Sequence, residues 1–134
     1  ALFAARAQKH GLRWRVLPSL CEVRSNSMLL ERMVCNLVSN AMRYTPEGGV
    51  LLSCRVRSGH LLIQVWDTGP GIPAHEQSTI FEAHYRGSAA QPHDKGLGLG
   101  LSIVSRCARL LGVRVGLKSV PGRGSRFELW VPLA

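Results

Sequence analysis

Acidic residues are scarce in this chain. Its 134 residues include 8 Asp and Glu against 17 Lys and Arg, which gives a formal net charge of +9. Such an excess of positive charge indicates an anionic partner, and nucleic acid, a nucleotide or an acidic protein would each fit. The arginines are spread along the chain, with no basic run and no interleaved aromatic residues. We therefore expect no nucleic-acid binding.

Long apolar runs are absent as well. No segment approaches the length of a membrane span and no secretory signal peptide is visible, so we expect no direct membrane contact. Hydrophobic residues make up 46% of the chain and charged residues 19%, which suits one globular domain with a real core. The opening segment A-L-F-A-A-R-A-Q-K is typical of a linker or the tail of a helix, and we expect the domain to come from a longer protein.

Metal-ligand spacing is also missing from the cysteines. Cys21, Cys35, Cys54 and Cys107 form no C-x-x-C pair and have no ligand-like histidines beside them. Each lies in or beside an apolar segment, so we expect buried free thiols in a reducing compartment. A disulfide or a metal site is the alternative.

The periodicity of apolar residues predicts an α+β fold. Alternating segments predict strands, and apolar residues repeating at helical spacing predict helices. The expected order is strand, helix, hairpin, short helix, mobile loop, helix and hairpin. This order predicts a two-layer α/β sandwich, with a mixed, mostly antiparallel sheet of about five strands and about three helices on one face. The predicted segments are a strand at 12–17, a helix at 28–44, strands at 50–57 and 60–67, a short helix at 74–81, a lid-like loop at 82–95, a helix from the glycines to 111, and strands at 113–119 and 125–131.

Two asparagines lie one turn apart on the helix predicted at 28–44. Asn40 projects into the apolar face between Leu29 and Met33, Asn36 lies on its margin, and Arg43 continues the same edge. Asparagine is a mediocre helix former and costs free energy when it is buried without partners. Either the pair bonds to neighbouring backbone, or its amide oxygens face a polar ligand or a hydrated Mg²⁺ with Arg43 reaching for phosphate.

A carboxylate ends the second strand of the first predicted hairpin. The alternation places Asp67 on the core side of that strand, where a carboxylate needs hydrogen-bond donors. It either caps the following turn by accepting from the N–H of Gly69 or Gly71, or it accepts a hydrogen bond from a ligand amine.

The turn after that strand also matches a dinucleotide fingerprint in part. Gly69, Gly71 and Ala74 satisfy G-x-G-x-x-[GA]. Pro70 and Pro73 disturb the tight strand-to-helix turn that the fingerprint needs, and no βαβ pattern surrounds it. The match is therefore a weak one.

The stretch Lys95–Val104, K-G-L-G-L-G-L-S-I-V, predicts a phosphate site. Gly96, Gly98 and Gly100 let the backbone approach a ligand closely, and the helix that follows offers unpaired N–H groups. The alternative is a flexible loop that caps a helix. The stretch is not a P-loop, because its lysine precedes the glycines, nor a dinucleotide fingerprint, because the third glycine would fall on Leu101.

Together these stretches resemble the ATP-binding catalytic domain of bacterial sensor histidine kinases. The segments at 36–45 (N-L-V-S-N-A-M-R-Y-T), 67–73 (D-T-G-P-G-I-P), 80–86 (I-F-E-A-H-Y-R) and 96–104 (G-L-G-L-G-L-S-I-V) are similar to the family's N, G1, F and G2 boxes, and 121–127 (P-G-R-G-S-R-F) to its last glycine turn. Any one box is a weak signal, whereas four in order at fitting spacing are specific. The superfamily includes DNA gyrase B, heat-shock ATPase chaperones and MutL.

The resemblance implies ATP and Mg²⁺ as cofactors. By it, Asn40 would coordinate Mg²⁺ and Asn36 would support the phosphate side. Arg43 would contact the γ-phosphate and Tyr44 would pack near the ribose. Asp67 would accept a hydrogen bond from the adenine N6 amine.

The resemblance also implies a mobile ATP lid between the F and G2 boxes. Arg86 would be a second phosphate contact at the edge of that lid, and Gly69 and Gly71 would admit the base. His84 replaces a phenylalanine that is frequent in the F box, so the lid lacks one aromatic side chain found in many relatives. The remaining expected nucleotide contacts are Ile72, Lys95, Gly96, Leu97, Gly98, Leu99 and Gly100.

One position favours phosphoryl transfer over hydrolysis. Hydrolysing members of the superfamily carry a glutamate base four residues before the metal asparagine, and here that position is Asn36, which has no basic site. The resemblance therefore implies transfer of the ATP γ-phosphate to a histidine. The alternatives are a related protein-serine kinase or ATPase, or a degenerate scaffolding module without nucleotide.

The phosphoacceptor is expected outside this chain. None of its five histidines lies in an H-E-L-R-T-P-like context. We expect residues 1–10 to be a linker or helix tail from an upstream dimerisation and phosphoacceptor domain, and residues 11–134 to be the catalytic domain. The resemblance also implies a response regulator receiver downstream, a monomeric isolated domain, a homodimeric parent and a cytoplasmic location, whether or not the parent is anchored in a membrane.

Overall fold

The computed structural model describes residues 2–9, 11–17, 27–72 and 97–133. The short helix predicted at 74–81 and the lid predicted at 82–95 lie outside the described residues. Arg86, Lys95 and Gly96 lie outside them too. None of the described helices combines the length and the apolar character that crossing a membrane requires.

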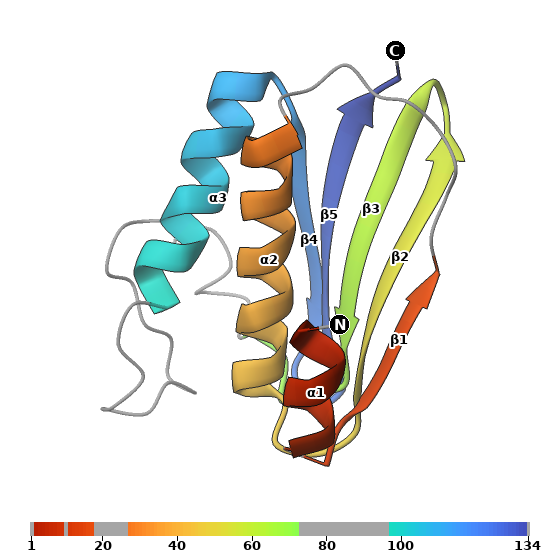
Figure 1. The fold of residues 1–134 in the computed structure, drawn as a ribbon, viewed down its shortest axis with the longest axis vertical. Helices are drawn as coiled ribbons and strands as arrows, with labels where there is room; N and C mark the ends of the chain where they lie inside the picture. Colours follow the sequence, from red (N-terminus) through yellow and green to blue (C-terminus); the bar gives the residue numbers. More distant parts are fainter. Residues whose placement is uncertain (1, 10, 18–26, 73–96, 134) are drawn as a thin grey trace.

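The described chain forms one five-stranded sheet with helices packed against it (Figure 1). The strand order is β1-β2-β3-β5-β4; β1 runs parallel to β2 and the other neighbours are antiparallel. The predicted α+β sandwich with a mixed, mostly antiparallel sheet is thus confirmed. The elements are α1 (Leu2–Lys9), β1 (Arg13–Leu17), α2 (Ser27–Tyr44), β2 (Gly49–Arg57), β3 (His60–Asp67), α3 (Leu97–Leu111), β4 (Arg114–Val120) and β5 (Gly124–Pro132).

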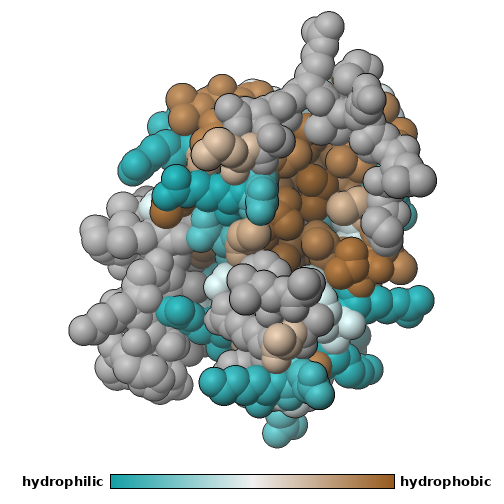
Figure 2. All heavy atoms as spheres, in the orientation of Figure 1, coloured by the Kyte–Doolittle hydropathy of each residue, from teal (hydrophilic) through white to brown (hydrophobic). Residues whose placement is uncertain are grey.

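The hydrophobic core lies between α2, α3 and the sheet. Its largest fully buried side chains come from α2 and β5, with Met33 and Leu37 on the helix and Phe127 and Leu129 on the strand. Leu129 pairs across the sheet with Val115, as expected for the inward side of the second hairpin. In the same orientation, Figure 2 shows hydrophobic side chains gathered over the strands to the right of α2.

The first hairpin is closed by a two-residue turn. Ser58 and Gly59 both have positive φ, 52° and 74°, as a type I′ turn requires. This turn matches the right-handed twist of the flanking strands and fixes the register, in which Arg57 pairs with His60 and Val50 with Asp67. The predicted hairpin is confirmed, and Asp67 therefore ends β3 beside the start of β2.

Helix α1 packs on the domain. Ala7 is 1% exposed within the core, and its carbonyl accepts a hydrogen bond from the Leu12 N–H at 2.9 Å. Of the two forms expected for this segment, a linker or a helix tail, the structure has a helix over Leu2–Lys9. The proposed domain boundary at residue 11 stays a prediction.

The start of α3 corrects one expectation. A glycine loop was predicted to precede this helix, but α3 begins at Leu97, so Gly98 and Gly100 lie within it. A glycine inside a helix costs about 1 kcal/mol relative to alanine. Packing of buried α3 residues such as Leu101 and Val104 against α2 outweighs that cost. The first turn of a helix still leaves N–H groups unpaired, so this start remains suited to an anion.

Three of the four cysteines lie in the described residues, and all three are free thiols. They are Cys35, Cys54 and Cys107, and Cys107 is buried. Burial, together with the Glu31 carboxylate, raises the pKa of the Cys35 thiol above its ordinary value, which favours the unreactive neutral form.

Candidate functional site

The end of α2 meets the turn that follows β3. A Cβ placed on Gly69 would lie 2.8 Å from the Tyr44 carbonyl oxygen and 3.2 Å from the Thr45 hydroxyl oxygen. Only glycine allows the turn to approach the helix end this closely. The segment at 36–45 and the described part of the segment at 67–73, residues 67–72, are therefore neighbours in the structure.

The two asparagines of α2 have different surroundings. The Asn36 side-chain amide donates to the Arg32 carbonyl at 2.8 Å, which is the backbone bond that the structural interpretation predicts. The Asn40 side-chain oxygen is buried and accepts no hydrogen bond from any described residue. Such an atom costs free energy, so Asn40 retains the need for a ligand that the sequence predicts.

A second unpartnered oxygen lies close by and was missed by the sequence analysis. Thr45 is 2% exposed, and its hydroxyl has no hydrogen-bond partner among the described residues. Like the Tyr44 carbonyl oxygen, the Thr45 hydroxyl lies next to the Cα of Gly69. A threonine directly after a helix end is a common capping or turn residue. Nothing in the sequence therefore marked Thr45 as a site residue.

Asp67 is held by backbone donors. Its Oδ1 accepts a hydrogen bond from the Gly69 N–H at 2.9 Å, so the turn-capping interpretation holds. Burial raises the pKa of the Asp67 carboxyl above its ordinary value, and the N–H groups of Gly69 and Ser125 partly oppose that rise. A carboxylate fixed in this way can still present acceptor capacity to a ligand amine, because each oxygen has two lone pairs.

The turn carrying Asp67 rests on a second glycine turn, between β4 and β5. Gly71 has a φ of +77°, and a Cβ on it would lie 2.5 Å from the Val120 carbonyl oxygen. The Gly122 N–H donates to the Pro70 carbonyl at 2.7 Å. The two turns therefore fit together only because Gly71 has no side chain.

Side-chain hydroxyls complete this support. The Ile72 N–H donates to the Ser119 hydroxyl at 2.7 Å. On the other side, the Gly49 N–H donates to the Thr68 hydroxyl at 2.9 Å, and the Thr68 N–H donates to the Gly49 carbonyl at 3.2 Å. The turn over residues 67–72 is thus fixed by β2, β4 and β5 together.

The other predicted site residues in the described part of the chain lie at the end of α2 and at the start of α3. Arg43 is exposed in the last turn of α2 and Tyr44 is half-buried beside it. The backbone of 97–100 forms the start of α3, which packs beside α2 (Figure 1). Among the described residues, no group of three or more His, Cys, Asp or Glu could hold a metal ion.

The sequence matches one known family along most of its length. A sequence model of the family described as "Histidine kinase-, DNA gyrase B-, and HSP90-like ATPase" matches residues 25–134. The adaptive-response sensory kinase SasA of Crocosphaera subtropica is 39% identical over 113 residues, and the sensor histidine kinase Hik2 of Thermosynechococcus vestitus is 37% identical over 133 residues. These matches cover 83% and 96% of this chain but only 29% and 34% of the two relatives.

Solved structures agree with the sequence matches. Full-length ShkA in complex with AMPPNP superposes with a TM-score of 0.84 at 33% identity, covering 99% of this chain and 28% of that one. The mycobacterial sensor histidine kinase MprB gives a TM-score of 0.82 at 26% identity, covering 99% of this chain and 92% of that one.

Proposed function

The chain belongs to the histidine kinase-, DNA gyrase B- and HSP90-like ATPase family, and from this premise we propose that it binds ATP with Mg²⁺ and transfers the γ-phosphate to a protein histidine. The observation that carries the proposal is the buried side-chain oxygen of Asn40, which has no partner among the described residues. It lies one helical turn before Tyr44, whose carbonyl meets the turn of Asp67 and Gly69.

The residues present fit such a nucleotide. Asn40 offers an oxygen ligand of the kind Mg²⁺ prefers. Gly69 has no side chain beside the end of α2, so a base would meet backbone there. Asp67 is oriented by the Gly69 N–H to accept from an exocyclic amine. Arg43 extends from the last turn of α2 to neutralise phosphate charge.

Bound ATP supplies the phosphoryl group, and bound Mg²⁺ neutralises the phosphate oxygens. The chain's own contribution is positioning and electrostatic stabilisation, which is most of what phosphoryl transfer needs. Asn36 provides no base for water, because its amide is used as a donor to the Arg32 carbonyl and has no basic site. Transfer to an imidazole needs little activation of the nucleophile, so this site favours a histidine acceptor over hydrolysis.

The acceptor and the remaining machinery lie outside this chain. We propose a histidine-bearing helical dimerisation domain in the same polypeptide as the acceptor and a response regulator receiver as the next partner. We place the domain in the cytoplasm, where ATP is available. The chain spans about a third or less of its curated relatives, so these assignments concern a longer protein.

Calorimetric titration of the purified chain with ATP tests the first half of the proposal. We expect binding that strengthens with Mg²⁺, and loss of that Mg²⁺-dependent gain in Asn40→Ala. Asn36→Ala changes an asparagine on the same helix whose amide has a backbone partner, and it should lose less of the Mg²⁺-dependent gain than Asn40→Ala. Unchanged ATP and Mg²⁺ binding in Asn40→Ala would place the pocket elsewhere.

Incubation with the histidine-bearing helical domain and ATP tests the second half. We expect an acid-labile phosphoprotein, as a phosphohistidine requires, and very slow hydrolysis by the chain alone. Fast hydrolysis that disappears when Asn36 is replaced would show an ATPase instead. An acid-stable phosphoprotein would show a serine kinase.

A further inference from the structure

The sheet face that points away from the helices gathers arginines from four of the five strands. The registers place these side chains on one face together with Leu51, Trp66 and Glu128, although they are far apart in sequence. The arginines are spread out along the sequence, and the strand order brings two of them beside tryptophans in the folded sheet. The arginines are Arg13, Arg15, Arg55, Arg57, Arg114 and Arg126.

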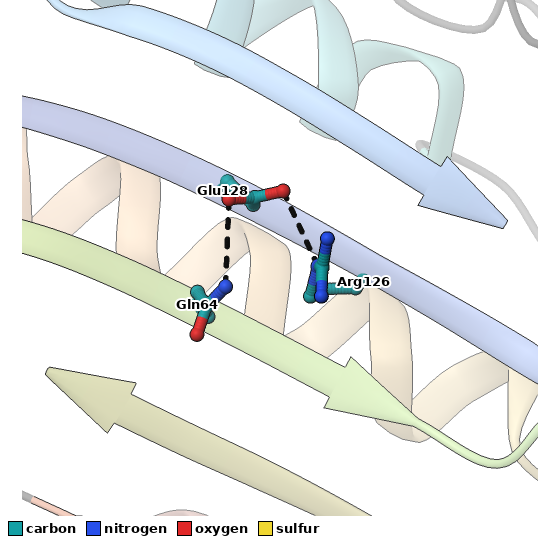
Figure 3. A network of polar contacts seen from close by, with 3 residues as sticks. All are labelled: Gln64, Arg126 and Glu128. Atoms are coloured by element: carbon teal, nitrogen blue, oxygen red, sulfur yellow. Dashed lines mark hydrogen bonds and ion pairs between the residues drawn. The ribbon is translucent and has the colours of Figure 1, made fainter.

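Negative charge hardly offsets this face. Among the described strand residues it carries one carboxylate, Glu128, which is 7% exposed. Figure 3 shows Glu128 between its two partners, with α2 behind the strands. Glu128 Oε1 pairs with Arg126 Nε at 3.2 Å, and Glu128 Oε2 accepts from Gln64 Nε2 at 3.4 Å. The buried acid therefore fixes one arginine and leaves the others in excess.

Two of the arginines are stacked on tryptophans. The Arg126 guanidinium lies 4.7 Å from the ring centroid of Trp66, and that of Arg114 lies 4.7 Å from the ring centroid of Trp130. Contact with the rings restrains the two guanidiniums and lowers the entropy lost when they bind carboxylates. It also occupies one ring face of each tryptophan, which weakens any role as a platform for nucleic-acid bases.

A cavity of about 400 Å³ opens at the end of this face. Arg13 and Arg15 of β1 line it together with residues of β2, of β3 and of the turn after β3, and Trp66 is 37% exposed. These residues are Gly49, Val50, Leu51, Trp66, Asp67 and Thr68. The floor of the cavity is mostly apolar while its rim carries two positive charges. Such a cavity is large enough for a bulky apolar side chain whose neighbours are acidic.

We propose that this face docks an acidic polypeptide segment that places one bulky apolar residue in the cavity between Arg13, Arg15 and Trp66. Charge complementarity sets the class of partner, because among the described strand residues this face offers its six arginines a single carboxylate, Glu128, which pairs with Arg126. The apolar floor favours a polypeptide over nucleic acid, since a phosphate backbone has no apolar side chain to bury. A second copy of this chain is disfavoured by its charge of +9. The cavity adjoins the turn of the proposed nucleotide site, because Asp67 and Thr68 also line it, and peptide docking is tested without nucleotide.

The test is titration of the purified chain with a short glutamate-rich peptide that carries one central phenylalanine. Intrinsic tryptophan fluorescence reports on Trp66, and calorimetry gives the affinity at low and high ionic strength. We expect binding that weakens with salt, and weakens about tenfold when the phenylalanine is replaced by alanine. The double change Arg13→Glu and Arg15→Glu should weaken it by at least about tenfold.

Arg106→Glu on α3 is the matched control, because Arg106 is exposed in the helix layer. Like each of the two β1 substitutions, it replaces one positive charge by one negative charge. It should leave the affinity for the peptide near that of the parent chain. Arg13→Ser with Arg15→Ser, checked by circular dichroism, separates lost docking from lost folding at the edge strand.

Three results would each overturn the proposal. One is equal weakening by Arg106→Glu, which would show attraction to net charge alone. Another is tighter binding of a single-stranded oligothymidylate than of the peptide, which would show a nucleic-acid surface. The third is absence of peptide binding at low ionic strength.

Discussion

The two walls of the candidate nucleotide site differ in how their polar groups are satisfied. In the turn after β3, Asp67, Thr68 and Ile72 all have backbone or hydroxyl partners at 2.7–3.2 Å. On α2 and directly after it, the side-chain oxygen of Asn40 and the hydroxyl of Thr45 are buried without partners among the described residues.

This difference separates a scaffold from a binding surface. The turn wall is completed by folding itself, so it is rigid before a ligand arrives. The helix wall keeps two unsatisfied oxygens, each at a cost in stability that a bound ligand can offset. Substitutions that remove a hydrogen-bond partner or fill the space beside a glycine in the turn wall should therefore damage the fold. Substitutions in the helix wall should damage binding while sparing or improving the fold. Asp67→Asn, which keeps its acceptor for the Gly69 N–H, is the exception in the turn wall.

The largest effect is expected at Gly71. Gly71→Ala should destabilise the domain by about 3 kcal/mol, because alanine resists its positive φ and its Cβ would meet the Val120 carbonyl. Urea denaturation measures the change. Gly112→Ala is the control: Gly112 has a φ of +67° but open space around its Cβ position, so about 1 kcal/mol is expected. Equal losses at the two glycines would remove the argument that the turns interlock.

Asn40→Ala should act in the opposite direction on the fold. Removal of a buried unpartnered oxygen and replacement by a better helix former should stabilise the domain by about 1.5 kcal/mol. The same change should abolish the Mg²⁺-dependent part of ATP binding. Asn36→Ala should stay within about 0.5 kcal/mol of the parent in stability. A destabilised Asn40→Ala would mean that the amide has a structural partner.

Two threonines offer an isosteric comparison across the walls. Thr68→Val removes the acceptor of the Gly49 N–H and should cost about 1 kcal/mol. Thr45→Val removes a hydroxyl without a described partner and should be neutral or slightly stabilising. Thermal unfolding of both variants in one buffer measures the difference. If Thr45→Val is the more harmful of the two, the contrast between the walls fails.

The smallest effect is expected at Asp67 and depends on pH. Burial raises its folded-state pKa above the ordinary value of 3.8, so ionisation of this carboxyl opposes folding. Its contribution to stability is full below that ordinary pKa and is lost as the pH rises through the folded-state pKa. Asp67→Asn keeps an acceptor for the Gly69 N–H, and its stability relative to the parent should rise from acidic to neutral pH.

Denaturation curves at several pH values measure this trend in stability. Titration with ATP and with GTP measures the nucleotide preference. Asp67→Asn should lose preference for ATP over GTP while gaining stability at neutral pH. A stability difference that does not change with pH would show that the carboxyl is not perturbed by folding.

Much of the fold could be predicted from the sequence because its elements are strongly periodic. The helix expected at 28–44 is observed as Ser27–Tyr44, and the strand pair expected at 50–57 and 60–67 is observed within one residue. The start of α3 could not be predicted, because the packing that offsets the cost of Gly98 and Gly100 is tertiary.

The site could be predicted where a residue type conflicts with its surroundings. Asn40 on an apolar helix face gave such a conflict, and the structure leaves its oxygen without a partner among the described residues. Thr45 gave no such conflict, because threonine is common directly after a helix end. The gathering of Arg13, Arg114 and Arg126 on one face could not be predicted either, since it follows from the strand order rather than from the local pattern.

The strand order has a consequence for biosynthesis. β5, the last strand in sequence, lies between β3 and β4, so β3 has an unpaired edge until residues 124–132 have left the ribosome. Until then the apolar residues Leu61, Ile63 and Val65 lack their partners on β5. Synthesis at about 5–20 residues per second makes this a brief but aggregation-exposed interval. The domain therefore completes its folding after translation of its final strand, and chaperone binding to nascent β3 would suit that delay.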